Sequence, residues 1–481
     1  MSRKVTVTRR IIGVAIGAVA LLLGLIVVVL LLVTPAEPQP GYRLAFFHHS
    51  KEDTNTRVCI ASPDGSDVRQ GPEASMYFSF LSPDGRWLAI YEIASWDHWR
   101  QIPIGVLEIV YVPTGEVVHH LNDLELCLPN VSCDTFLAWS PDSMALAYLS
   151  SPAGQVGIDT WVYDLATGTA INVVHNEGHR NIMDWSPDSE WVILIAPVMV
   201  VRKAPNRSQI GFWNIETVRA NGSERRIIAD MYAAGFDVEL FTFVPPLCNL
   251  AWSPDGDYIT FEDSCGGVSL GRRLFVAATD GSGVHLLLDM TIENKRESIQ
   301  VHYDTWWSPS GDRLRIAYAQ QIVTRLAYPL FYLPTSVEEI GVVVFDGDTF
   351  SIVERAEPLD FHSTSVSWSP DGRFLLLWKD YFRRGTPTHP IAVAEFSDGQ
   401  LSLFDLAAEL PAGACSSPQW SPDGRYIVYA GSNASDDLCP YDHGESIVTI
   451  SFPDGHVTDV TASLGTNNRL IGWIPDTSDR P

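Results

Sequence analysis

Three histidines stand at a similar place in the chain, five or six residues before a tryptophan that starts a recurring Trp-Ser-Pro phrase. They are His179, His302 and His362. Imidazoles that converge on one opening can ligate a metal ion or bind an anionic group. Four more polar residues share this zone of the chain and complete the candidate ligand-binding set: Arg180, Tyr303, Asp304 and Arg469.

We expect this set to line an opening near the axis of a radial fold, but we assign no metal ion and no cofactor to it. The three histidines fall in repeats that are not all adjacent, and an inward polar side chain commonly bonds to loop backbone instead. The pairs His48-His49 and His119-His120 are poor chelates, because neighbouring residues of a strand point to opposite faces.

One segment has the spacing of a nucleophilic serine. Gly267-Val-Ser-Leu-Gly271 fits the G-x-S-x-G pattern. That pattern works at a strand-to-helix turn of an α/β-hydrolase sheet. The surrounding sequence predicts a loop between short strands, and the segments on either side of the repeats are too short for a hydrolase domain. We therefore assign no catalytic residue.

The elements that must position these side chains are set by a short phrase that recurs from residue 81 onward. Pro presets φ, Asp bonds to its own backbone two residues on, and Gly accepts a positive φ. Each phrase is therefore predicted to be a tight turn between two strands. Seven copies and a degenerate eighth begin at Leu81, Trp139, Trp185, Trp252, Trp307, Trp368, Trp420 and Trp473.

A second turn follows each strand pair, for example at Pro113-Thr-Gly115 and Pro453-Asp-Gly455. The intervening runs are rich in β-branched and aromatic residues, as strands are. Four strands with two turns per repeat predict the blades of a β-propeller. The last repeat supplies one strand and the segment from residue 42 supplies three. We expect an all-β, eight-bladed propeller closed by pairing the C-terminal strand with this N-terminal half-blade, with seven blades as the alternative.

Both kinds of tight turn are predicted to lie on one face of the propeller, named here the bottom face. The longer connections lie on the opposite top face, where loops on a rigid scaffold commonly bind partners. The insertions in these loops fall near residues 95–100, 197–246, 319–337 and 380–384. Four aromatic residues in them are candidates for partner contact, with packing inside their own loops as the alternative: Trp96, Trp99, Tyr381 and Phe382.

Seven cysteines in an exported chain favour disulfides. Cys248 and Cys265 flank one predicted antiparallel strand pair, so both are expected at the top face. Cys415 and Cys439 flank another pair in the same way. We predict the disulfides Cys248–Cys265 and Cys415–Cys439, with Cys127–Cys133 as a third within a loop. Cys59 is left over and is expected to be buried; reduced, buried cysteines throughout are the alternative.

The repeat resembles that of the TolB-type, WD-repeat-like propellers, whose hallmark is an aromatic-Ser-Pro-Asp-Gly phrase. The resemblance covers about residues 42–477 and implies the fold more strongly than any activity, because such propellers occur in scaffolds, sensors and peptidases. Sialidase propellers have a different repeat, and the prolyl-oligopeptidase group carries its serine in a separate domain.

The N-terminal region has the features of a membrane anchor. Residues 11–33 contain no charged residue and are long enough to cross a ~30 Å hydrocarbon core. The preceding basic residues place the N-terminus in the cytoplasm, and a cleaved signal peptide is the alternative. We expect a basic tail at 1–10, a transmembrane helix at 11–33, a Pro-rich linker at 34–41, the propeller at 42–477 and a tail at 478–481.

The charge of the chain restricts its partners. The formal net charge is −26, which repels phosphate backbones and argues against nucleic acid. The leading hypothesis is a membrane-anchored, extracytoplasmic propeller that binds a protein, peptide or envelope polymer through its top face without catalysis. One alternative is a metal-assisted hydrolase or lyase at the axial opening; another is a purely structural part of an envelope complex.

Overall fold

The fold is that of a computed structural model, in which Tyr42–Pro475 form one compact unit. The predicted membrane segment and residues 34–40 of the predicted linker lie outside the described residues. Within the described ranges, no helix is long and apolar enough to span a bilayer. The structure describes residues 41–49, 56–73, 79–97, 102–124, 137–150, 159–175, 184–200, 210–230, 247–263, 273–289, 301–309, 314–325, 334–360, 365–378, 391–406, 416–431, 446–464 and 468–476.

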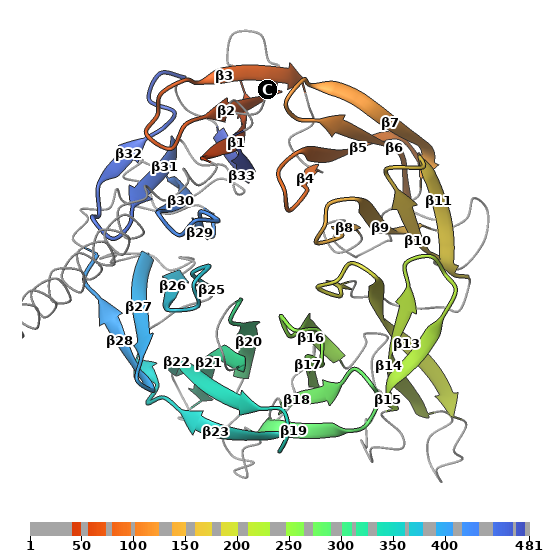
Figure 1. The fold of residues 1–481 in the computed structure, drawn as a ribbon, viewed down its shortest axis with the longest axis vertical. Coiled ribbons are helices and arrows are strands. Elements are labelled where there is room, and N and C mark those ends of the chain that lie inside the picture. The colour runs from red at the N-terminus through yellow and green to blue at the C-terminus, as the bar shows by residue number, and fades with distance from the viewer. Residues whose placement is uncertain are drawn as a thin grey trace, which may run out of the picture. The chain divides into compact units, whose positions relative to one another are not determined.

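Eight antiparallel sheets, named blades 1 to 8, are formed by the described residues and follow one another around a ring (Figure 1). Each blade is given from its innermost strand outward. Blade 1 contains β33 (Asn468–Pro475), β1 (Tyr42–His49), β2 (Thr56–Ala61) and β3 (Arg69–Glu73). Blade 2 contains β4 (Ser79–Leu81), β5 (Trp87–Asp97), β6 (Ile102–Tyr111) and β7 (Glu116–Leu124). Blade 3 contains β8 (Leu137–Trp139), β9 (Ala145–Ser150), β10 (Asp159–Asp164) and β11 (Thr169–Val174).

Blades 4 to 6 continue the pattern. Blade 4 contains β12 (Asp184–Trp185), β13 (Trp191–Val200), β14 (Ile210–Arg219) and β15 (Arg225–Asp230). Blade 5 contains β16 (Leu247–Trp252), β17 (Tyr258–Asp263), β18 (Arg273–Ala278) and β19 (Val284–Asp289). Blade 6 contains β20 (Val301–Trp307), β21 (Leu314–Arg325), β22 (Pro334–Asp346) and β23 (Ser351–Arg355), with the short β24 (Leu359–Asp360) also pairing with β22.

Blades 7 and 8 bring the chain back to its first blade. Blade 7 contains β25 (Ser365–Trp368), β26 (Phe374–Trp378), β27 (Ile391–Ser397) and β28 (Gln400–Phe404). Blade 8 contains β29 (Gln419–Trp420), β30 (Tyr426–Gly431), β31 (Ser446–Ser451) and β32 (Val457–Asp459). The predicted eight-bladed, all-β propeller is confirmed for this unit.

The ring closes through the antiparallel pair of β1 and β33. Tyr42 lies opposite Pro475 and His48 lies opposite Asn468, so the pairing runs the length of both strands. His48 Nδ1 and Asn468 Oδ1 are 2.9 Å apart in the buried interior of this blade. The predicted closure by the C-terminal strand is confirmed, and it leaves no open sheet edge between the chain ends.

The Ser-Pro-Asp phrase closes its turn by a fixed set of hydrogen bonds. In blade 2 the Ser82 hydroxyl donates to Asp84 Oδ1 (2.7 Å) and accepts the N–H of Trp87 (3.0 Å). Asp84 Oδ1 also accepts the N–H of Arg86 (3.0 Å), as predicted. Burial acts to raise the pKa of Asp84, but these donors outweigh it and the pKa lies below its ordinary value. Blades 3, 4, 5, 7 and 8 repeat the three bonds.

The last residue of the turn has a positive φ, which Gly85 adopts without strain at 69°. Ser143 and Ser189 take this place in blades 3 and 4, each with a φ of 62°. Their hydroxyls offset the strain, because Ser143 Oγ accepts the N–H of Asp84 and Ser189 Oγ accepts the N–H of Asp142, both at 3.0 Å. Each serine therefore links the turns of two neighbouring blades.

The tryptophan of the repeat connects each blade to the one before it. In five blades its indole Nε1–H donates to the carbonyl that directly precedes the equivalent residue of the previous blade, at 3.0–3.3 Å. The donors are Trp139, Trp185, Trp307, Trp368 and Trp420. Trp252 and Trp473 carry a buried Nε1 that has no partner in the described part of the chain.

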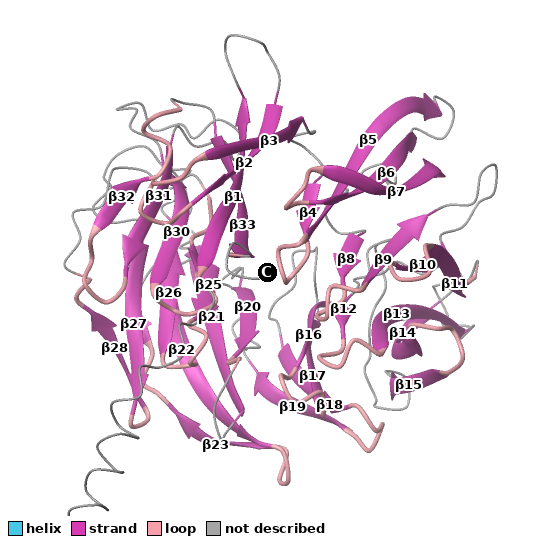
Figure 2. Cartoon of the chain, turned by 45° about the horizontal axis from the view of Figure 1, so that its top comes forward, coloured by secondary structure: helices cyan, strands magenta, loops and turns pink. Residues whose placement is uncertain are grey.

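Three alternate blades carry long paired ribbons where loops were expected. The insertions of blades 2, 4 and 6 continue the second and third strands of the blade as antiparallel pairs (Figure 2). The prediction of loops was wrong for these parts, because apolar and β-branched residues extend the strands. The last paired residues are Asp97 with Ile102, Val200 with Ile210, and Arg325 with Pro334.

The inter-blade indole bond can be tested by substitutions at two buried repeat positions. Trp185→Phe removes the bond to the Ala138 carbonyl, whereas Trp473→Phe removes an Nε1 that has no partner among the described residues. Both lose similar apolar area, so we expect Trp185→Phe to lower the free energy of unfolding by about 1 kcal/mol more than Trp473→Phe. Urea unfolding of both variants measures the difference, and equal losses would contradict a stabilising role for the bond.

Candidate binding site between blades 4 and 5

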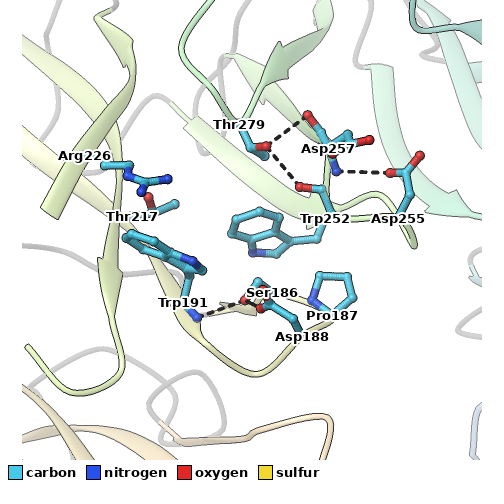
Figure 3. A pocket seen from close by; sticks show the side chains of 11 residues that line it. Ser186, Pro187, Asp188, Trp191, Thr217, Arg226, Trp252, Asp255, Asp257 and Thr279 are labelled. Atoms are coloured by element: carbon cyan, nitrogen blue, oxygen red, sulfur yellow. Dashed lines mark hydrogen bonds between the residues drawn. The ribbon is translucent and has the colours of Figure 1, made fainter. Parts of the chain in front are cut away.

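A cavity of about 210 Å³ opens on the bottom face between blades 4 and 5, and we call it the interblade slot (Figure 3). The Ser-Pro-Asp turns of both blades border it. Its aromatic walls are Trp191, at the start of β13, and Trp252, at the end of β16. Thr217 and Thr279 also line it.

One position beside the slot is polar where the equivalent positions of other blades are apolar. The residue at the end of the third strand donates its N–H to the carbonyl of the residue that precedes the second strand, and this bond identifies equivalent positions across blades. Blade 5 has Thr279 at this position. The other blades that share the bond have apolar residues there: Val112, Leu165, Ala220, Phe396 and Phe452.

In blades 7 and 8 the apolar residue covers the repeat tryptophan of its own blade. Phe396 lies 6.5 Å from Trp368 and Phe452 lies 5.0 Å from Trp420, measured between ring centroids. Thr279 is shorter, and its Oγ1 is turned to the backbone, where it donates to the Gly256 carbonyl at 3.0 Å. Trp252 is partly buried, and its ring borders the slot (Figure 3).

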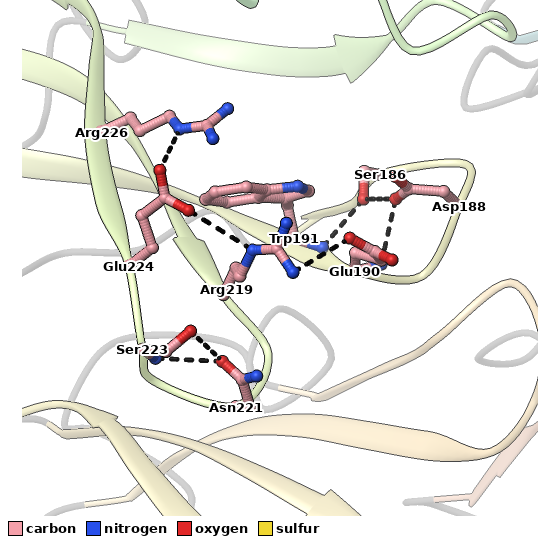
Figure 4. A network of polar contacts seen from close by, with 9 residues as sticks. All are labelled: Ser186, Asp188, Glu190, Trp191, Arg219, Asn221, Ser223, Glu224 and Arg226. Carbon is pink, nitrogen blue, oxygen red and sulfur yellow. Dashed lines mark hydrogen bonds and ion pairs between the residues drawn. The ribbon is translucent and has the colours of Figure 1, made fainter.

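The opposite wall is held rigidly by charged neighbours. The guanidinium carbons of Arg226 and Arg219 lie 4.2 and 4.9 Å from the centroid of the Trp191 ring, within cation–π range. Arg226 Nε donates to Glu224 at 2.7 Å, and Arg219 pairs with Glu190 at 3.3 Å (Figure 4). The hydrogen bond from Arg226 holds the pKa of Glu224 below its ordinary value. The two arginines thus cover the Trp191 ring, of which 9% is exposed.

The polar groups of the slot include both donors and acceptors. Asp188 and Asp255 use Oδ1 within their own turns, which leaves Oδ2 of each with no donor among the described residues. Asp257 also lines the slot. A donor at the slot is the guanidinium group of Arg226. Nε1 of Trp252 is buried, with no partner in the described ranges, and is not exposed to the slot.

Asp184 lies on the innermost strand beside this site. Burial raises the pKa of its carboxyl group to about 6, while the N–H groups of Trp185 and Trp252 act to lower it. The carboxylate therefore contacts the backbone of Trp252, one wall of the slot. The equivalent residue of the previous blade is Ala138, whose backbone carbonyl accepts the indole N–H of Trp185.

The predicted axial set is described only in part. Residues 302–304 lie on β20 and Arg469 lies on β33, the innermost strands of blades 6 and 1. These blades are not adjacent, and only the backbone is described for His302, Tyr303 and Asp304. His179, Arg180 and His362 lie outside the described residues. In the described part of the chain, no cluster of three His, Cys, Asp or Glu side chains could hold a metal ion. The axial site stays a prediction.

The other predicted site residues are also largely outside the described ranges. Trp96 lies on β5 opposite Pro103, with only its backbone described. Cys248 lies on β16 opposite Glu262 in the same way. Outside the described residues lie Trp99, Tyr381, Phe382, the Gly267–Gly271 segment and the remaining predicted disulfide cysteines, Cys265, Cys415, Cys439, Cys127 and Cys133. The contacts and disulfides stay predictions.

The expectation that Cys59 is buried and outside any disulfide is confirmed. It lies on β2 as a free thiol with no exposed surface. Burial raises the pKa of this thiol to about 11, although Arg57 acts to lower it. The group is therefore a protonated, unreactive part of the core of blades 1 and 8.

Comparison with known sequences finds a distant relative. No known protein-family profile matches the chain. A stretch of 242 residues is 27% identical to an uncharacterized protein of Agrobacterium fabrum and covers 48% of this chain and 66% of that protein. The match thus spans just under two thirds of the relative's length.

Several solved propellers are similar at low identity. An oligogalacturonate lyase in complex with manganese is 14% identical over 83% of this chain and 96% of its own, with a TM-score of 0.43. Prolyl oligopeptidase B from Galerina marginata is 15% identical over 82% of this chain and 50% of its own, with a TM-score of 0.43. TolB from Acinetobacter baumannii is 14% identical over 58% and 60%, with a TM-score of 0.30. Similarity at this level transfers no activity.

The raised pKa of Asp184 predicts a specific pH dependence. Between about pH 4 and 6 the folded chain retains a proton that the unfolded chain releases, so this group's contribution to stability falls as pH rises through that window. Asp184→Asn keeps the acceptor oxygen and cannot ionise. From pH 5 to 8 we expect the free energy of unfolding of the variant to gain about 1 kcal/mol relative to the parent. Urea unfolding at a series of pH values measures this, and parallel profiles would show that Asp184 is not buried as described.

Proposed function

We propose that this chain is a non-catalytic binding module, anchored by residues 11–33, that presents its propeller outside the cytoplasm and recruits a protein partner through the top face. The observation that carries the proposal is the set of extended ribbons on blades 2, 4 and 6. The hydrophobicity of residues 11–33 and the basic residues before them support the anchor and its orientation.

The ribbons extend past the sheets that support them. In blade 4 the residues 197–200 pair with 210–213, while β12 pairs with β13 only at residues 192–193 and β15 pairs with β14 only from residue 214. No described strand pairs with the outer edges of this ribbon. The ribbon ends of blades 2 and 6 are built in the same way.

An unpaired strand edge on a rigid blade is a template for binding an extended segment of another protein. Each ribbon also contains one proline, Pro103, Pro197 or Pro334, which removes one N–H donor and limits unselective strand addition. The ribbon of blade 4 is apolar in sequence, with Val198-Met-Val200 facing Ile210-Gly-Phe212 in register. These features favour a protein partner over a charged polymer.

Shortening the ribbons tests the proposal. Residues 95–104, 197–213 and 323–336 are each replaced by Asn-Gly, which forms a two-residue hairpin turn. We expect the propeller to remain folded, because the described residues of each removed segment pair only within their own ribbon. We also expect loss of the proteins that cross-link to the full-length chain. Quantitative mass spectrometry of cross-linked partners measures the loss.

Asp280→Ser, an exposed substitution in a bottom-face turn, serves as the matched control. It should retain every partner that the ribbon variant loses. Retention of all partners by the ribbon variant would contradict the proposal. Partners lost equally by the control would point instead to a structural role in a larger assembly.

A further inference from the structure

We propose that the interblade slot binds one uncharged sugar ring, as a free monosaccharide or as the terminal residue of a glycan. The slot lies on the bottom face, opposite the ribbons, so this site is independent of the proposed partner surface. The inference rests on the size of the cavity, on its aromatic walls and on the kinds of polar group around it.

The size of the slot favours a single ring. The slot has a volume of about 210 Å³. Pockets for drug-sized ligands start at about 300 Å³, so a longer oligomer would extend out of the slot. One six-membered ring with its hydroxyl groups matches the available space.

The polar groups exclude ligands that carry only hydrogen-bond donors or only hydrogen-bond acceptors. The guanidinium group of Arg226 needs acceptors, whereas Oδ2 of Asp188 and Oδ2 of Asp255 need donors. An ammonium ion supplies no acceptor, and an anion would face the carboxylates of Asp188 and Asp255 in a chain of net charge −26. Hydroxyl groups donate and accept at once, so a polyhydroxylated ring satisfies both sets.

The aromatic walls suit the remaining surface of such a ligand. The C–H face of a sugar ring is apolar and packs on an indole, and the partly buried ring of Trp252 offers that surface. Trp191 is fixed by its two arginines (Figure 4), so little order is lost when the ligand binds. Thr279 keeps the space open where blades 7 and 8 have Phe396 and Phe452.

The test uses the purified full-length chain and three probes, methyl glucoside, methyl galactoside and N-acetylglucosamine. Binding is followed by saturation-transfer NMR and by tryptophan fluorescence. We expect at least one probe to bind saturably below about 10 mM, and Thr279→Phe to weaken it at least about tenfold. The phenylalanine should leave the thermal midpoint unchanged, because blades 7 and 8 already hold phenylalanine at this position. If the phenylalanine ring does not fit, Thr279→Leu is used instead of Thr279→Phe, because blade 3 has Leu165 at this position.

Asp280→Ser again serves as the control, since it neighbours Thr279 but does not line the slot, and it should bind like the parent. Binding of methyl glycosides identifies the terminal residue of a glycan as the natural ligand class, whereas binding of free sugars alone identifies monosaccharides. The proposal is overturned if no sugar binds, if Thr279→Phe binds as tightly as the parent, or if tetramethylammonium or inorganic phosphate displaces the sugar from the slot. None of these results depends on the ribbons, so the two proposals fail separately.

Discussion

The contact between each repeat tryptophan and the blade before it is the interaction on which the rest of the propeller depends. A blade is a small twisted sheet that cannot bury both of its faces alone. The indole supplies apolar area to the interface, and in five blades its N–H also fixes the spacing by donating to a carbonyl of the preceding blade. This repeated bond gives the blades that make it the same spacing. The pairing of β1 with β33 joins the two ends of the chain within one blade and so completes the ring.

This constraint also explains where a cavity can form. The interface must fill the space around each indole, and most blades do so with the apolar residue at the end of the third strand. At blade 5 that residue is Thr279, and the indole of Trp252 also lacks a bond to the described part of the preceding blade. Two departures from the repeat therefore coincide at one interface. A role in stability alone would not explain this loss of packing. We therefore interpret the slot as a binding site.

Much of the fold follows from local sequence. The turn phrase determines its own hydrogen bonds through Ser82 and Asp84 and their equivalents, so the number of blades could be counted from its copies. The terminal blade could be inferred because the last repeat supplies one strand and the segment from residue 42 supplies the other three. The ribbons were not foreseen, since a long strand and a long loop both appear in sequence as an insertion between turns.

The slot was missed because Trp252 is one of the repeat tryptophans, which were expected to be core residues. The available indication was Thr279, which is polar where the equivalent residues of other blades are apolar. These equivalent positions can be aligned only when the residue at which each strand ends is known.

The acidic character of the chain has a structural origin that bears on binding. Aspartates such as Asp84 and Asp423 are used inside turns, where hydroxyl and N–H donors overcome the effect of burial and keep them ionised. The second carboxylate oxygen is used differently from turn to turn. Asp84 Oδ2 and Asp423 Oδ2 accept from the arginine two residues further on, whereas Oδ2 of Asp188 and of Asp255 has no donor among the described residues. Between blades 4 and 5 the same oxygens border an open, aromatic-walled slot together with Arg226. The turn chemistry that builds the propeller thus supplies two acceptor oxygens of the site, those of Asp188 and Asp255.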